Sequence, residues 1–334
     1  MIPDRLTIQW HLTDVCNYRC KHCYQESYQD KGANLGKLIT SLNKIEKFVD
    51  QLSTPQKKVK THFNFTGGEP FLKDNFLDLL REVDSKRKFS FAILSNGFLL
   101  QNKELQLLKE LKPRFVQISI EGNEYINDSI RGKGAYQTAI KAIKTYKKFK
   151  IPVFISFTAN AINYKYFPEV VKTGRKLNVD KVWTDRYLPF GKNDNLLMNT
   201  NQVKEFFALI LQERKNKIFH PFSKTEISAG RALQFLMNGG QPYSCSAGAT
   251  LLAIMPNGNI LPCRRLPIKV GNLYDDDLMD VYQNNQFLKS LRSNESLDKN
   301  CIKCFYKNAC KGGLKCLSFA TAGDYNLKDP NCWI

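Results

Sequence analysis

The sequence predicts an α/β fold, a partial (β/α)6 barrel followed by a small cysteine-rich domain. Two observations predict it. Short β-rich segments alternate with longer amphipathic segments up to about residue 190, and the residues after about 238 are dense in cysteine and glycine. Six units rather than eight favour an open, TIM-like partial barrel with its functional site at the C-terminal ends of the strands.

The strand candidates are segments rich in β-branched and aromatic residues. They are residues 6–12, 62–65, 89–94, 115–120, 153–159 and 181–187. The helix candidates carry apolar residues at helical spacing, as Leu105, Leu108 and Leu111 do. They are residues 35–52, 75–86, 103–111, 135–149, 167–177 and 201–217. Because a helix follows each strand, we expect parallel strands with crossover helices.

The character of the sequence changes at residues 238–242, Asn-Gly-Gly-Gln-Pro, which predict a break in the chain. We therefore divide the chain into residues 1–238 and 239–334. A hairpin is predicted around Pro256-Asn257-Gly258, with strands at 251–255 and 259–262. The second region has few apolar runs, so we expect it to lack an apolar core of its own and to be organised by metal.

The chain of 334 residues carries a formal charge of +19. Nucleic acid, acidic peptides or acidic redox proteins would each account for this charge, and so would solvated lysine-rich helix faces. No RNA-binding domain is appended, so a nucleic-acid partner is not expected. Neither a secretory signal nor a run of about 18 apolar residues is present, so we expect a cytoplasmic protein that does not enter a membrane.

The ten cysteines are unevenly distributed along the chain: three fall within residues 16–23, none within 24–244 and seven within 245–332. Thiols stay reduced in the cytosol, so this distribution favours metal binding over disulfides. Cys16, Cys20 and Cys23 have the spacing C-x3-C-x2-C directly after the first predicted strand. Three such thiolates can hold three irons of a [4Fe–4S] cluster and leave the fourth iron open. Zinc would instead prefer two pairs of ligands.

This motif resembles that of the radical S-adenosylmethionine (SAM) superfamily, and further family motifs follow at successive strand ends. Residues 66–70, Thr-Gly-Gly-Glu-Pro, resemble the GGEP motif, whose backbone and glutamate bind the SAM amino group. A carboxylate suits an ammonium, and glycines let the main chain approach a ligand closely. The resemblance also implies that Arg131, in Arg-Gly-Lys-Gly-Ala-Tyr, reaches the SAM carboxylate. In full, the implied cofactor contacts are His22, Gly67, Gly68, Glu69, Pro70, Ser95, Asn96, Ser119, Glu121, Arg131 and, in the motif at 186–191, Arg186. For His22 we expect a backbone contact rather than a fourth iron ligand.

The C-terminal cysteines resemble the seven-cysteine SPASM domain, which holds two auxiliary [4Fe–4S] clusters. One departure is that five residues separate Cys310 from Cys316, where the family usually has three. The resemblance implies an inner cluster held by Cys245, Cys263 and Cys316, and an outer cluster held by Cys301, Cys304, Cys310 and Cys332. The alternative, a four-cysteine zinc ribbon, leaves three cysteines unexplained. The inner set lacks a fourth cysteine, so its last iron is open, bound by water or held by an oxygen ligand such as Asp275 or a tyrosine.

The implied cofactors are thus three [4Fe–4S] clusters and SAM, and the implied reaction is reductive cleavage of SAM to a 5′-deoxyadenosyl radical. Auxiliary clusters suit oxidative outcomes, so we expect maturation of a ribosomally made peptide by a thioether or carbon–carbon crosslink. One alternative is action on a small molecule or cofactor precursor, as in haem or quinone-cofactor pathways. Another is formylglycine formation in sulfatases, which Arg264 and Arg265 disfavour because that branch has an acid directly after the cysteine aligned with Cys263.

The expected partners are a peptide substrate and a flavodoxin or ferredoxin reductant. The first predicted strand begins at residue 6, so we expect the barrel rim, the SPASM domain or a separate adaptor protein to recognise the leader of a peptide substrate.

Overall fold

The structure is a computed structural model that describes residues 3–189, 194–219, 223–228, 232–238, 243–293 and 297–334. Its described strands form one sheet with the order β10-β9-β8-β1-β2-β3-β4-β5-β6-β7. The strands are β1 Arg5–His11, β2 Lys60–Thr66, β3 Phe89–Ser95, β4 Val116–Ser119, β5 Val153–Ala159, β6 Lys181–Arg186, β7 Glu226–Ser228, β8 Leu251–Ile254, β9 Asn259–Leu261 and β10 Gly271–Asn272. Strands β1 to β6 are parallel, as the alternation of strands and helices predicts.

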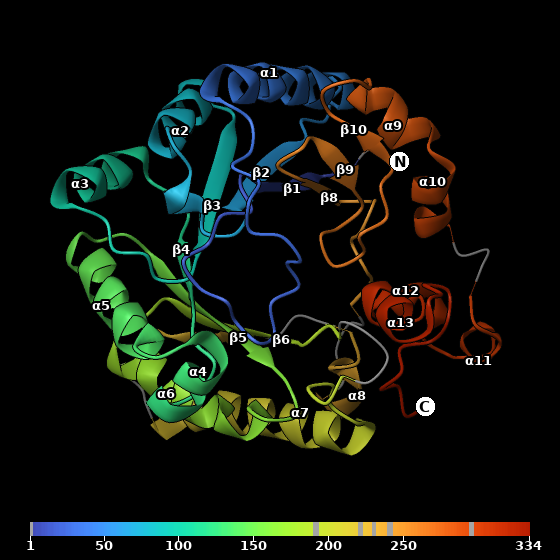
Figure 1. The fold of residues 1–334 in the computed structure, drawn as a ribbon. Coiled ribbons are helices and arrows are strands. Elements are labelled where there is room, and N and C mark those ends of the chain that lie inside the picture. The colour runs from blue at the N-terminus through green and yellow to red at the C-terminus, as the bar shows by residue number, and fades with distance from the viewer. Residues whose placement is uncertain (1–2, 190–193, 220–222, 229–231, 239–242, 294–296) are drawn as a thin grey trace.

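The helices lie outside the curved sheet, and the loop that follows β1 lies inside the ring that they form (Figure 1). The longer helices are α1 Leu35–Leu52, α2 Phe76–Ser85, α3 Asn102–Leu111, α4 Glu124–Arg131, α5 Ala135–Lys148, α6 Phe167–Lys176 and α7 Thr200–Lys215. The shorter ones are α8 Phe235–Asn238, α9 Leu278–Asn284, α10 Gln286–Arg292, α11 Lys299–Ile302, α12 Lys307–Cys310 and α13 Lys315–Ala322, with 3-10 turns η1 Pro70–Leu72, η2 Tyr164–Tyr166 and η3 Asn216–Phe219. None of the described helices combines the length and the apolar character needed to span a membrane.

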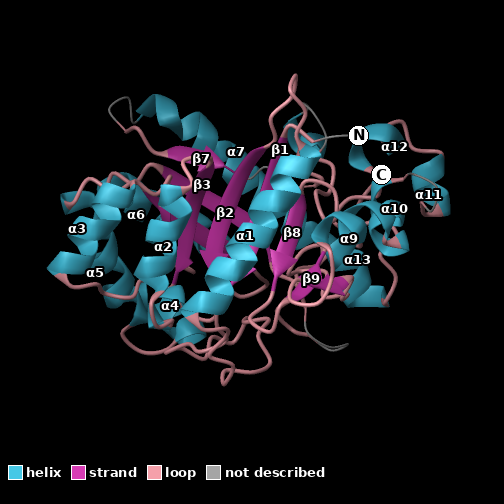
Figure 2. Cartoon of the chain, turned by 90° about the horizontal axis from the view of Figure 1, so that it is seen from above, coloured by secondary structure: helices cyan, strands magenta, loops and turns pink. Residues whose placement is uncertain are grey.

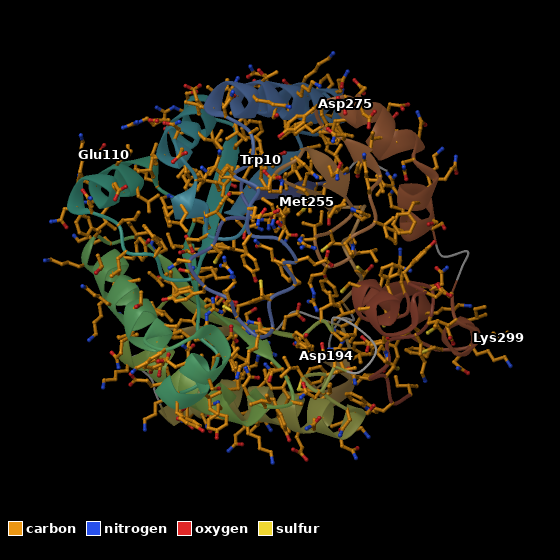
Figure 3. All side chains as sticks on the ribbon, viewed as in Figure 1. Trp10, Glu110, Asp194, Met255, Asp275 and Lys299 are labelled. Carbon is orange, nitrogen blue, oxygen red and sulfur yellow. The ribbon has the colours of Figure 1, made fainter. Side chains whose placement is uncertain are left out.

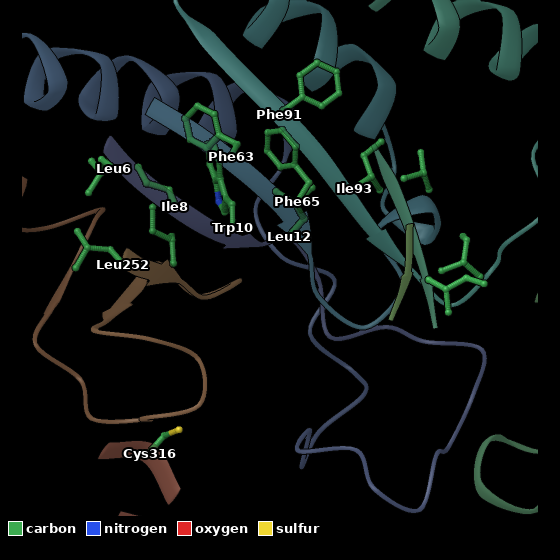
Figure 4. Close-up of a cluster of buried hydrophobic side chains, with 14 of the residues drawn as sticks. Leu6, Ile8, Trp10, Leu12, Phe63, Phe65, Phe91, Ile93, Leu252 and Cys316 are labelled. Atoms are coloured by element: carbon green, nitrogen blue, oxygen red, sulfur yellow. The ribbon is translucent and has the colours of Figure 1, made fainter. Parts of the chain in front are cut away.

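The core between sheet and helices is built from alternate residues of the strands. In β1, Leu6, Ile8 and Trp10 are buried, and Trp10 packs against Phe63 and Phe65 of β2 at ring-centroid distances of 5.8 and 5.9 Å (Figure 4). Successive residues of a strand point to opposite faces of the sheet, so every second residue lies on the same face. The apolar face therefore packs against the helices, and the opposite face of β1 points into the barrel.

The cysteine-rich region extends the barrel sheet and shares its core. Strand β8 pairs in parallel with β1, with Leu252 beside Ile8, and β8 and β9 form the predicted hairpin (Figure 2). Leu252, Ile260 and Leu288 are fully buried and belong to the same apolar cluster as Ile8. As expected, these residues pack on the barrel core rather than on a core of their own, and the edge of β1 supplies the apolar surface. Metal is therefore not the only feature that organises β8 and β9.

The predicted fold class is confirmed, with two additions. Strands β7 and β8 lengthen the parallel sheet beyond six strands, with β7 beside β6. The break predicted at 238–242 includes residues 239–242, which lie outside the described residues, as do residues 190 and 191 of the motif that begins at Arg186.

Candidate active site

The loop between β1 and α1 carries Cys16, Cys20 and Cys23. Burial raises the pKa of Cys16 and of Cys20. The three thiols lie close together, since Cys23 helps to raise the pKa of both Cys16 and Cys20, and Cys16 adds to the shift of Cys20. The loop is fixed to the barrel by the Lys21 amide, which donates to the Ile130 carbonyl of α4 at 2.9 Å. The structure therefore brings the three predicted ligands together inside the barrel mouth.

Glu69 is a fully buried carboxylate at the end of β2. It accepts hydrogen bonds from the Ser95 hydroxyl at 2.9 Å, the Asn96 amide at 2.7 Å and the Phe71 amide at 3.3 Å. Burial raises the pKa of Glu69 to about 7, and these hydrogen bonds offset only part of that effect. Within the described residues no lysine or arginine forms an ion pair with this carboxylate. It is thus suited to receive a cation from outside the protein.

Asn96 links the Glu69 carboxylate to the loop that carries Cys16, Cys20 and Cys23, which we name the cluster loop. Its backbone amide donates to Glu69, and its side-chain amide donates to Asn17 Oδ1 at 2.7 Å and lies 3.7 Å from the Cys16 sulfur. Asn96, from the motif at the end of β3, therefore contacts both the Glu69 carboxylate and the loop of the N-terminal cysteines.

The glycines of the Gly-Gly-Glu-Pro segment serve the contact with the cluster loop. The amide of Gly68 donates to the Thr13 carbonyl at 2.7 Å. A Cβ at Gly67 would lie 2.3 Å from the Thr13 oxygen, and one at Gly68 would lie 2.2 Å from the Val15 oxygen. The glycines are expected to let the main chain approach a ligand closely. In the structure they let the backbone at Gly67 and Gly68 approach the backbone at Thr13 and Val15. Pro70 follows Glu69 and begins η1.

Glu121 and Arg131 form a buried ion pair beside the cluster loop. Arg131 donates to Glu121 at 2.8 Å, and the His22 side chain lies 3.3 Å from the same carboxylate. Burial alone would raise the pKa of Glu121, but His22 and Arg131 outweigh it and hold the pKa below its usual range. The His22 side chain therefore contacts Glu121, and the backbone contact with the cofactor that is expected of His22 stays a prediction. Ser119 ends β4, two residues before Glu121.

Three buried polar atoms at this site have no partner within the described residues. They are His22 Nδ1, Asn96 Oδ1 and Arg131 Nε. Unpaired buried polar atoms are costly, so such a group indicates a polar ligand. The ammonium of SAM matches the Glu69 carboxylate, which has no ion pair within the described residues. The carboxylate of SAM matches the Nε donor of Arg131, and the three thiols match an iron–sulfur cluster. The residues present therefore fit both groups.

Arg186, for which a cofactor contact is predicted, is bound to the C-terminal segment in the structure. It ends β6, is 3% exposed, and donates to both carboxylate oxygens of Asp329, at 2.9 and 2.6 Å. It also donates to Asn331 Oδ1 at 2.8 Å. The Arg186 guanidinium thus joins the barrel mouth to the C-terminal segment. Sequence reasoning missed Asp329, for which the only sequence signal was that a buried arginine needs an acid.

The structure brings Cys245, Cys263 and Cys316 together, as predicted for the inner set. Burial raises the pKa of Cys316 to about 12, and the other two thiols contribute to this shift. Arg265 lies beside the set and is ion-paired with Asp185 of β6, an acid that the sequence reasoning also missed. Buried thiols must lose their protons to bind iron, so assembly of a cluster here would release protons.

The inner set is tied to the cluster loop by the residue that follows Cys263. Arg264 donates to the Tyr24 carbonyl at 3.0 Å, and its guanidinium lies 4.6 Å from the centre of the Tyr24 ring. Tyr24 directly follows Cys23. Burial raises the pKa of Tyr24, and Cys23 and Cys263 are both near enough to add to that shift. Tyr24 therefore lies near one cysteine of the N-terminal set, Cys23, and one cysteine of the inner set, Cys263.

The oxygen ligands considered for the inner set are placed differently. Asp275 is exposed in the turn after β10, at the edge of the molecule near α9, where Lys44 of α1 donates to the neighbouring Tyr274 carbonyl (Figure 3). Tyr24 lies near Cys263. Asp275 is therefore placed away from the inner set, and a tyrosine ligand stays a prediction.

The outer set surrounds a small pocket between α8, α11, α12 and the C-terminal residues. Burial raises the pKa of Cys301 and of Cys310 to about 11 in each case, and Cys304 and Cys332 add to both shifts. Other residues that line the pocket include Phe235, Tyr306 and Asp329. The cysteines that line it are Cys301, Cys304, Cys310 and Cys332. The two predicted groupings of C-terminal cysteines therefore match two separate places in the structure.

Two family models match the chain. The model of the radical SAM superfamily matches residues 10–174, and that of an iron–sulfur cluster-binding domain, SPASM, matches residues 245–305. The first range includes Cys16, Cys20 and Cys23. The second includes four of the seven C-terminal cysteines and ends before Cys310.

Curated relatives span nearly the whole chain. The AdoMet-dependent heme synthase of Methanosarcina barkeri is 23% identical over 97% of this chain and 95% of its own length. The antilisterial bacteriocin subtilosin biosynthesis protein AlbA of Bacillus subtilis is 26% identical over 99% of this chain and 71% of its own length.

Solved structures share the fold. Streptococcus suis SuiB bound to S-adenosylmethionine has a TM-score of 0.78 at 17% identity, covering 99% of this chain and 77% of SuiB. Native anSMEcpe with bound AdoMet and Cp18Cys peptide has a TM-score of 0.77 at 18% identity, covering 98% and 94%. The chain therefore belongs to the radical SAM superfamily, as an enzyme with a C-terminal SPASM iron–sulfur cluster-binding domain.

Proposed function

We propose that this enzyme holds three [4Fe–4S] clusters and installs an oxidative crosslink, thioether or carbon–carbon, in a peptide. When bound, the N-terminal cluster and SAM supply 5′-deoxyadenosyl radical chemistry, which abstracts hydrogen from an unactivated C–H bond. Cys16, Cys20 and Cys23 would hold that cluster. Glu69 would bind the SAM ammonium and Arg131 its carboxylate.

One observation carries the oxidative outcome. Arg264, which follows Cys263 of the inner set, donates to Tyr24, which follows Cys23, so a substrate at the barrel mouth would lie near a second redox site. A crosslink requires the substrate to lose two hydrogen atoms. The first leaves with the radical, and the second leaves as a proton and an electron. A neighbouring electron acceptor supports this second step.

A peptide substrate is supported by two further observations. The relative AlbA is a bacteriocin biosynthesis protein. The described sheet also has two ends, β7 and β10, rather than closing into a full barrel, as an extended substrate chain would require. The second candidate is a haem-pathway small molecule, which the M. barkeri heme synthase favours because 95% of its length is covered.

Formylglycine formation receives no support from the geometry. Both residues after Cys263 are arginines engaged elsewhere, Arg264 with Tyr24 and Arg265 with Asp185. Neither can act as the general base that this reaction needs at that position.

Metal analysis tests the cluster content. Anaerobically reconstituted protein should bind about twelve irons, since each of three clusters holds four. The Cys16→Ala/Cys20→Ala/Cys23→Ala variant should lose about four of them, keep both auxiliary clusters and form no 5′-deoxyadenosine. Stoichiometric zinc in place of the C-terminal iron would contradict the two auxiliary clusters.

Turnover distinguishes the two substrate classes. The reconstituted enzyme with SAM and dithionite is offered short cysteine- and aromatic-containing peptides encoded beside its gene, and separately iron-containing tetrapyrroles. A crosslinked peptide is lighter by two hydrogen atoms and yields one linked fragment on digestion. Conversion of a tetrapyrrole with no change in any peptide would reject the peptide proposal.

A further inference from the structure

An apolar surface lies on the loop that carries two of the outer cysteines. Phe305 directly follows Cys304 and is 92% exposed, and Ile302 is 52% exposed. Ile334, 57% exposed, lines the pocket of the outer set beside Tyr306. Exposed aromatic side chains of this kind often mark interaction sites.

Lysines surround these apolar side chains. Lys299, Lys303 and Lys307 are all exposed, and within the described parts of the chain none of them forms an ion pair. Lys299 points outward at the edge of the molecule (Figure 3). We name Ile302, Phe305, Ile334 and these three lysines the outer patch. A positive surface with an apolar centre suits an acidic partner protein.

Aromatic contacts connect the outer patch to the pocket of the outer cysteines. The Phe305 ring packs edge-on against Tyr306 at 5.1 Å, and Tyr306 packs against Phe235 at 4.6 Å. Tyr306 and Phe235 both line the pocket with Cys301, Cys304, Cys310 and Cys332. A partner bound at the outer patch would therefore contact the same loop that holds two proposed cluster ligands.

We propose that the outer patch docks an acidic one-electron carrier protein of the flavodoxin class, which exchanges an electron with the outer cluster. The outer cluster would give up one electron and be oxidised, and the carrier would take up that electron and be reduced. A second copy of this chain is disfavoured because two lysine-ringed patches would repel each other. A small patch also suits a transient redox encounter. The proposal rests on the proposed outer cluster.

Binding of oxidised flavodoxin to the reconstituted enzyme tests this proposal without turnover. Titration calorimetry at low and high salt is compared for the wild type, Lys303→Glu/Lys307→Glu and Phe305→Ser. The matched control is Lys141→Glu/Lys144→Glu, which changes the net charge equally but lies on α5, where Lys141 and Lys144 line a separate surface site. We expect both patch variants to weaken binding, the lysine pair by about tenfold at low salt and much less at high salt.

The control variant should weaken binding by less than about threefold, because only long-range attraction changes. Equal weakening by both lysine pairs would overturn the outer patch as the docking site, as would no weakening by either. A dimer of the wild type that Phe305→Ser dissociates would assign the patch to a second copy instead. A wild-type iron content of about eight would contradict the outer cluster itself, and with it the electron exchange, even if flavodoxin bound.

Discussion

Glu69 is buried among hydrogen-bond donors, and its pKa of about 7 should make the proposed binding of SAM sensitive to pH. Only the ionised carboxylate attracts an ammonium, so binding should lower this pKa and release a proton. We expect SAM affinity to rise as pH increases from about 6 to about 8. Calorimetry in buffers of different ionisation enthalpy would measure both the affinity and the proton release.

The Glu69→Gln variant is the control for this prediction. It should lose about 1.5–3 kcal/mol of SAM binding free energy, typical of a hydrogen bond to a charged group. Its remaining affinity should no longer depend on pH in this range. An unchanged pH dependence in Glu69→Gln would show that another group titrates.

Gly68 fixes the position of the cluster loop. A Cβ there would lie 2.2 Å from the Val15 oxygen and 2.6 Å from the Asp14 oxygen, and backbone atoms cannot yield as a flexible side chain can. We expect Gly68→Ala to displace the loop that leads into Cys16 and to lose about four irons, while both auxiliary clusters remain. Iron analysis and electron paramagnetic resonance would measure this loss.

The matched control for this variant is Gly36→Ala in α1. A Cβ at Gly36 meets no atom closer than 3.7 Å. This substitution should keep all the iron and raise stability slightly, since alanine favours a helix over glycine by about 0.5–1 kcal/mol. Full iron retention in Gly68→Ala would show that the loop tolerates the displacement.

Most elements of the barrel could be predicted from periodicity alone. Helix α1 begins and ends where the apolar spacing indicates. Its start is fixed by the Asn34 side chain, which accepts a hydrogen bond from the Lys37 amide. Helix α4 was not predicted. It has only eight residues, and its buried face includes the polar Asn127 and Arg131, so apolar spacing does not reveal it.

The site could be predicted where one motif supplies neighbouring residues. The three N-terminal cysteines lie together because the same short loop carries them. The partner of Arg186 could not be predicted, because Asp329 lies 143 residues away in the sequence. The pairing of β8 with β1 was missed for the same reason, since hairpin residues reveal their local turn but not which distant edge they join.

This pairing predicts how the enzyme behaves without metal. Strands β8 and β9 are held by the barrel sheet and by buried Leu252 and Ile260, not by cysteine ligands. In protein stripped of iron we expect β8 to keep its amide protection, while residues 298–334 exchange faster. Hydrogen-exchange mass spectrometry of the stripped and reconstituted protein would measure this difference. Loss of protection in β8 would restore the view that metal organises the whole region.

At the scale of the whole molecule, three arginines join the barrel to the cysteine-rich domain. Arg265 is ion-paired with Asp185 of β6. Arg264 reaches from the inner set to the loop of the N-terminal set. Arg186 reaches from the end of β6 to Asp329, which lines the outer pocket. The relative positions of the three cysteine sets are thus determined by buried polar contacts as well as by the shared core.

The Arg186–Asp329 pair allows this coupling to be measured. Both side chains are nearly fully buried, at 3% and 1% exposed. Asp329→Asn leaves the arginine without a counter-charge, so we expect a loss of about 3–5 kcal/mol in the free energy of unfolding. Because Asp329 lines the outer pocket beside Cys310 and Cys332, the same variant should lose about four irons.

Two comparisons separate charge from simple loss of stability. Arg186→Met/Asp329→Asn removes both charges and should be less destabilised than Asp329→Asn alone, since no unpaired charge stays buried. Glu213→Gln breaks the Arg175–Glu213 pair, whose atoms are 2.8 Å apart between α6 and α7. It should lower stability but keep all the iron, because that pair touches no cysteine set. Equal iron loss in Glu213→Gln and Asp329→Asn would mean that general destabilisation, and not the link to the barrel, controls the outer cluster.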